Sequence, residues 1–67
     1  MFNKNLFRAK IVEHGLTLRA VAEILGMTEP TLHRKMKGES EFTRNEIQLF
    51  REQLGLSIEE VEAIFFT

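Results

Sequence analysis

The sequence contains no cysteine, no tryptophan, no tyrosine and no aspartate. Without cysteine the chain has neither a disulfide framework nor a thiolate metal site, which is typical of proteins from the reducing interior of a cell. Without aspartate it has no Ser-His-Asp set, and its only histidines are His14 and His33. The neighbouring carboxylates Glu59 and Glu60 lie in a helix-start pattern and do not face one site. We therefore expect no enzyme, no metal ion and no cofactor.

Long apolar runs are also missing. No stretch approaches the ~20 residues that a membrane span needs, and no signal peptide opens the chain. We therefore expect a cytoplasmic protein with no membrane partner. A chain of 67 residues fits one domain, here 1–67, and leaves no room for a ligand-sensing domain, so we expect no small-molecule ligand.

The formal net charge of −1 hides a strong polarity along the chain. Residues 1–38 hold seven Lys and Arg against three Glu, a balance of +4, whereas residues 39–67 hold two Arg against seven Glu, a balance of −5. Such asymmetry indicates a nucleic acid or another polyanion on the basic side. The alternative is that the acidic half simply keeps the protein in solution.

Helix-start and helix-stop residues alternate along the chain. Thr43 with Glu46 and Ser57 with Glu60 have the spacing of capping boxes, in which a hydroxyl and a carboxylate satisfy the first free amides of a helix. Asn3, Thr17 and Thr28 are further N-cap candidates, and each of Gly15, Gly26, Gly38 and Gly55 follows an apolar stretch, where a helix ends. The pattern predicts an all-α fold with helices over 4–13, 18–24, 29–36, 44–53 and 58–65.

The apolar positions of these helices predict one core. It comprises Leu6, Phe7, Ile11, Leu16, Val21, Ala22, Leu25, Leu32, Met36, Phe42, Ile47, Phe50, Leu54, Leu56, Val61, Ile64 and Phe65.

Residues 17–38 carry the most informative pattern. A short helix, a turn over 26–28 and a second short helix match the helix-turn-helix motif, whose second helix lies in the major groove of DNA. Ala22 is small enough to let the two helices cross closely, and Gly26 is free to take positive φ in the turn. Pro30 falls in the first turn of the second helix, where its missing N–H costs nothing.

With Ala22, Gly26 and Leu32 at signature positions, the sequence resembles the Cro/cI-type helix-turn-helix proteins, also called lambda-repressor-like or XRE proteins. The likeness covers nearly the whole chain and implies a compact five-helix DNA-binding domain. A narrower likeness, to small phage-encoded members, rests on the stretch 35–38, Phe42, Glu46, Ile47 and the closing residues 64–66. Three residues depart from the family pattern. Leu18 stands where Gln is frequent, Lys35 where an apolar residue is usual, and Met36 where Glu is frequent.

The outer face of the helix over 29–36 is the candidate surface for reading bases. A helical wheel turns Leu32 and Met36 towards the core and leaves the opposite face to the predicted base-contacting residues, Glu29, Pro30, His33 and Arg34. Arg34 is suited to two hydrogen bonds with guanine O6 and N7. The alternatives are that Arg34 and His33 are ordinary surface residues, and that Glu29 only complements the helix dipole.

Phosphate contacts are expected at helix starts and in loops, where amides and hydroxyls point outward. The predicted phosphate-contacting residues are Thr17, Arg19, Thr28, Thr31, Lys37, Thr43, Arg44 and Asn45. Capping alone is the alternative role for Thr17, Thr28 and Thr43.

The last helix ends in an apolar cluster. In the resembling family this helix commonly makes the two-fold dimer contact, which implies a homodimer interface formed by Val61, Ile64, Phe65 and Phe66. Alternatively, Phe66 folds back over the edge of the core.

Two hypotheses for function follow. The first is a sequence-specific double-stranded DNA-binding regulator of transcription, Cro- or repressor-like, that occupies an operator. The second is a protein-binding module, such as an antirepressor, that keeps the helix-turn-helix fold and binds its partner through the acidic half or the Phe66 cluster. The low charge and the departures at Leu18 and Lys35 favour the second.

Overall fold

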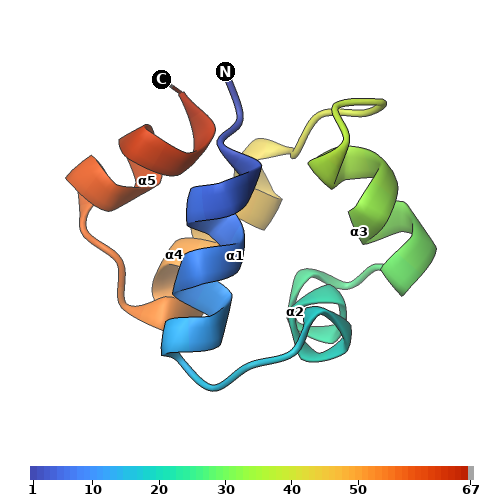
Figure 1. The fold of residues 1–67 in the computed structure, drawn as a ribbon, viewed down its shortest axis with the longest axis horizontal. Helices are drawn as coiled ribbons and strands as arrows, with labels where there is room; N and C mark the ends of the chain where they lie inside the picture. The colour runs from blue at the N-terminus through green and yellow to red at the C-terminus, as the bar shows by residue number, and fades with distance from the viewer. Residues whose placement is uncertain (67) are drawn as a thin grey trace.

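A computed structural model of the chain describes residues 1–66, which form five helices and no strand. The helices are α1 (Lys4–Glu13), α2 (Leu18–Leu25), α3 (Glu29–Met36), α4 (Arg44–Leu54) and α5 (Ile58–Phe65). Figure 1 shows α5 on one side of α1, and α2 and α3 on the other. The predicted all-α fold is confirmed, and α2 and α4 each run one residue further than the sequence predicted. Within the described residues no helix has the length and apolar character to cross a membrane.

All five predicted N-caps are confirmed. The side chains of Asn3, Thr17, Thr28, Thr43 and Ser57 each accept a hydrogen bond from a backbone amide three residues on. The two predicted capping boxes are complete, since Glu46 and Glu60 accept from the amides of their own N-caps. Each predicted helix-ending glycine has positive φ. Each helix end depends on residues that are close together in the chain, and the helix bounds could therefore be predicted from the sequence.

The core is a single cluster, and every fully buried residue in it was predicted. Its members are Phe7, Ile11, Val21, Ala22, Leu25, Leu32, Met36, Phe50, Leu54, Leu56, Val61, Ile64 and Phe65. Leu6, Leu16, Phe42 and Ile47, which were also expected in the core, are only half-buried and pack against its edge.

Five phenylalanine rings form one cluster, three of them in the buried core and Phe2 and Phe42 packed against its edge. Phe7 of α1 stacks on Phe50 of α4 with ring centroids 4.7 Å apart, and Phe2, Phe42 and Phe65 pack around them at 5.1–6.0 Å. Such ring pairs add about 0.5–1.5 kcal/mol each to the effect of burial. The rings come from the N-terminal segment, α1, the loop before α4, α4 itself and α5, so one cluster holds together segments distant in sequence.

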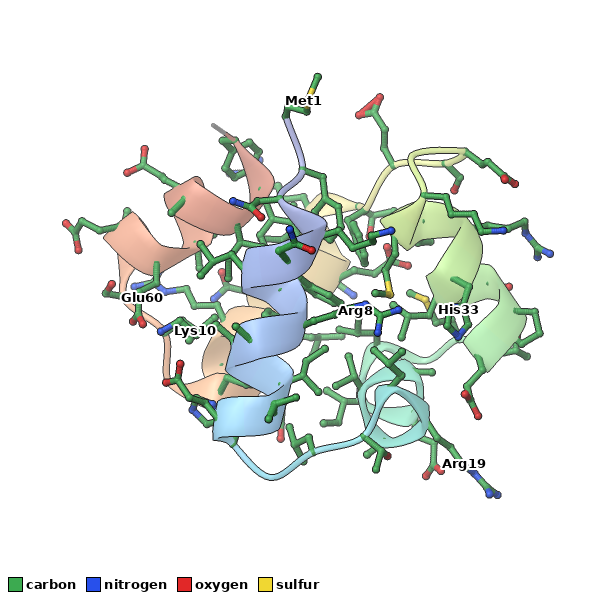
Figure 2. The ribbon with its side chains drawn as sticks, viewed as in Figure 1. Met1, Arg8, Lys10, Arg19, His33 and Glu60 are labelled. Atoms are coloured by element: carbon green, nitrogen blue, oxygen red, sulfur yellow. The ribbon has the colours of Figure 1, made fainter. Side chains whose placement is uncertain are left out.

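An ion pair joins α1 to α5. The Lys10 ammonium lies 2.6 Å from Oε2 of Glu60, and the two side chains meet in Figure 2. The other oxygen of the same carboxylate, Oε1, accepts from the Ser57 amide of the capping box at 2.9 Å. These hydrogen bonds favour the charged carboxylate, with Lys10 contributing most, and lower the pKa of Glu60 from 4.5 to about 2.

Glu60 therefore makes stability depend on acid pH. In the unfolded chain the carboxyl takes up a proton near pH 4.5, whereas in the folded protein it does so only near 2. Its contribution is complete above the higher value and is lost as the pH falls through this window. We expect Glu60→Gln, whose amide keeps the capping box, to flatten the fall in unfolding free energy between about pH 4.5 and 2.

Urea unfolding followed by circular dichroism at several pH values measures this slope. Glu59→Gln, at an exposed neighbouring position, is the matched control and is expected to keep the slope of the unmodified protein. Equal slopes for Glu60→Gln and the unmodified protein would contradict the role of the ion pair.

Candidate nucleic-acid interface

The helix-turn-helix motif begins with the packing of α2 against α3. Val21, Ala22 and Leu32 are almost completely buried between the helices and the core, so small and branched side chains set how closely the two helices approach. Gly26 ends α2 with φ 73° and ψ 33°, and the Met27 amide then donates to the Ala22 carbonyl at 2.9 Å. This left-handed residue reverses the chain within a turn of three residues, as the sequence predicted.

Hydroxyl groups organise the start of α3. Thr28 caps the helix by accepting from the Thr31 amide at 3.4 Å, and its own hydroxyl donates to Oγ1 of Thr31 at 3.1 Å. Oγ1 of Thr31 also accepts from the Arg34 guanidinium at 3.2 Å. The cap is thus connected through Thr31 to the arginine that the sequence singled out for base contact, a link that helix periodicity permits but does not reveal.

The outer face of α3 has the composition that the helical wheel predicted. Glu29, Pro30 and Arg34 are exposed, and His33 is half-buried. Leu32 and Met36 point into the core. The predicted base-contacting residues therefore lie on the accessible part of one short helix.

The predicted phosphate-contacting residues lie at four helix ends, the starts of α2, α3 and α4 and the C-terminal end of α3. Thr17 and Arg19 stand at the start of α2, and Arg19 extends into solvent in Figure 2, with its Nε 3.9 Å from the exposed Glu23 carboxylate. Thr28 and Thr31 stand at the start of α3, and Lys37 directly follows its last residue. Thr43, Arg44 and Asn45 are exposed at the start of α4. Capping is shown for Thr17, Thr28 and Thr43, while phosphate contact stays a prediction.

Sequence reasoning missed the partner of Lys35. Its Nζ donates to the Glu41 carbonyl at 2.8 Å and lies 3.3 Å from Oε1 of Glu46, the carboxylate of the α4 capping box. The ammonium also lies 6.0 Å from the centre of the Phe42 ring. Nothing in the local pattern gave this contact, because Lys35 and Glu46 belong to different helices. Two of the cations in the basic half, Lys35 and Lys10, are thus paired with glutamates of α4 and α5.

The four residues predicted for the dimer interface separate into two groups. Val61, Ile64 and Phe65 are buried in the core, each 8% exposed or less, whereas Phe66 is 64% exposed. Phe66 borders a groove of about 580 Å³. Apolar side chains from both ends of the described chain and the α3–α4 region line it, among them Met1, Phe2, Phe42, Ile47 and Phe65. Among residues 1–66 no group of three or more His, Asp or Glu is placed to hold a metal ion.

The comparison with known families agrees with this geometry. A family model described as helix-turn-helix matches residues 7–61, from within α1 to the middle of α5. The chain belongs to the Cro/cI-type helix-turn-helix family. This is a family of DNA-binding domains, and the match contains the whole of α2, the turn and α3. No curated protein and no solved structure matched the chain.

The turn of the helix-turn-helix motif gives a direct test of the fold. A Cβ added at Gly26 would meet no atom within 4 Å, so the constraint is its positive φ and not lack of space. We expect Gly26→Ala to lower the free energy of unfolding by about 1–2 kcal/mol, measured by urea unfolding. Gly26→Asn is expected to lose less, because asparagine tolerates left-handed backbone. An alanine variant as stable as the unmodified protein would contradict this account.

Proposed function

We propose that this protein is a sequence-specific double-stranded DNA-binding regulator of transcription, Cro- or repressor-like, that acts in the cytoplasm by placing α3 in the major groove of an operator. The observation that carries the proposal is the accessible outer face of α3 in a helix-turn-helix domain, with Arg34 joined by a hydrogen bond to Thr31. A guanidinium offers parallel donors that match guanine O6 and N7.

The surroundings of α3 support the same docking. Exposed cations stand at the starts of the two helices that flank α3 in the chain, Arg19 in α2 and Arg44 in α4, and Lys37 directly follows α3. Amides and hydroxyls at helix starts suit phosphate oxygens, which fix the register of a protein on the duplex. The acidic second half of the chain disfavours nonspecific attachment to DNA and so leaves the basic side to make the contact.

Removal of the guanidinium tests the base-contacting role. A selection from random duplexes at two salt concentrations first supplies the preferred sequence. We expect Arg34→Ala to weaken binding of that duplex by about 1–3 kcal/mol and to relax the preference at one base pair. Fluorescence anisotropy measures the affinity, and a repeated selection measures the preference.

Lys4→Ala is the matched control, since it removes one exposed cation from α1, a helix outside the helix-turn-helix motif to which no contact with DNA is assigned. It is expected to keep the sequence preference. The proposed function fails if the α3 amides of the unmodified protein do not shift in an NMR titration with duplex DNA at low salt.

We further propose that the protein binds its operator as a homodimer joined through the C-terminal end of α5. Phe66 is the support, because its ring is mostly exposed beside an apolar groove. Val61, Ile64 and Phe65 then act indirectly, by holding the end of α5 against the core.

Sedimentation equilibrium tests the dimer. We expect the unmodified protein to associate and Phe66→Ser to shift it towards monomer. Ile58→Ser is the control, since Ile58 is the other exposed large apolar residue of α5. A protein that stays monomeric at millimolar concentration would contradict the dimer.

The second candidate function is a protein-binding module such as an antirepressor. The groove beside Phe66 favours it, as does the use of Lys35 within the fold in place of a contact with DNA. The two functions separate clearly, because only the first is impaired by Arg34→Ala.

A further inference from the structure

We propose that Lys35 is a positioning residue, which sets the start of α4 relative to α3 and so determines whether both can contact one duplex. The inference rests on the proposed function, in which α3 reads bases and Arg44 at the start of α4 contacts phosphate. Lys35 itself is given no contact with DNA.

The contacts of Lys35 converge on the start of α4. Its ammonium is shared between the Glu41 carbonyl, in the loop before α4, and Oε1 of Glu46. The same Oε1 accepts from the Thr43 amide at 2.9 Å, and the Thr43 hydroxyl accepts from the Glu46 amide at 3.2 Å. One lysine of α3 therefore holds both the loop and the cap of the next helix.

Burial makes this link firm. The side chain of Lys35 is 11% exposed and that of Glu46 is 17% exposed, so water competes poorly for either charge. A buried charge that loses its partner is strongly unfavourable, which keeps the pair closed. The exposed pair between Arg19 and Glu23, at 3.9 Å, shows the contrast, since pairs of that kind contribute little.

The path of the chain explains why such a link matters. Residues 37–43 join α3 to α4 through turns and bends, and both helices pack on α2. The backbone hydrogen bonds that close α3 reach the Glu39 amide. Beyond that residue the Lys35 contacts with Glu41 and Glu46 connect the loop and α4 directly to α3. The distance between the base-reading face and Arg44 thus depends on this side chain.

If Lys35 only stabilised the fold, DNA binding would recover whenever stability recovers. A pair of variants separates this structural role from the positioning role. Lys35→Met leaves the Glu46 charge buried and is expected to lower stability. Lys35→Met combined with Glu46→Gln removes both charges while glutamine keeps the capping box, so its stability is expected to recover towards that of the unmodified protein. The positioning role predicts that DNA binding does not recover with it.

The experiment measures the affinity of each variant for the duplex obtained by selection, over a range of salt concentrations. Losing one phosphate contact makes the fall of log K with log salt less steep by about 0.9. Near 0.1 M salt this corresponds to a loss of about tenfold in affinity. We expect this loss for the neutral pair variant, the same loss for Arg44→Gln, and no further loss when the two are combined. Lys35→Arg keeps the positive charge at this position and is expected to bind like the unmodified protein. Lys4→Met controls for the removal of one positive charge.

The outcomes distinguish the two proposals. If the unmodified protein binds no duplex, the proposed function itself fails and the positioning role falls with it. If the unmodified protein binds and the neutral pair variant keeps its affinity and salt slope, the proposed function stands and the positioning role is wrong. Additive losses from the neutral pair and from Arg44→Gln would also overturn it, because the two changes would then act separately.

Discussion

The packing of four phenylalanine rings around Phe7 is the constraint on which the rest of this structure depends. A chain of 67 residues has little apolar surface to bury, and it has no disulfide to compensate. The rings come from five separate segments, so their contacts fix the relative positions of α1, α4 and α5 together. The helix-turn-helix pair is joined to this aromatic cluster through α2, which packs against both α3 and α4.

The glutamates of the two capping boxes each have two roles in the fold. In each box the glutamate accepts from the amide of its own N-cap and also binds a lysine from another helix, Lys35 for Glu46 and Lys10 for Glu60. A single carboxylate thus ends a local structure and joins two distant ones. The lysines that complete these pairs belong to the basic half of the sequence, so part of the charge asymmetry serves the fold and not a ligand.

The features that the sequence predicted correctly are those determined by residues close together in the chain. The helices, their caps and the inward faces follow from side chains three or four positions apart, and the left-handed glycines follow from sterics. The partner of Lys35 could not be predicted, because it depends on how α3 and α4 pack. Phe66 illustrates the same limit, since helix periodicity could not decide between an exposed ring and one folded over the core. Which residues contact DNA is a property of a complex and stays a prediction.

The contacts between the two ends of the described chain have a consequence for folding during synthesis in the cell. The Asn3 amide donates to the Ile64 carbonyl at 2.7 Å, and the Phe2 ring packs on Phe65. These contacts span almost the whole sequence, so the aromatic core cannot close until α5 has left the ribosome. Until then the nascent chain carries Phe2 and Phe7 without one of their partners.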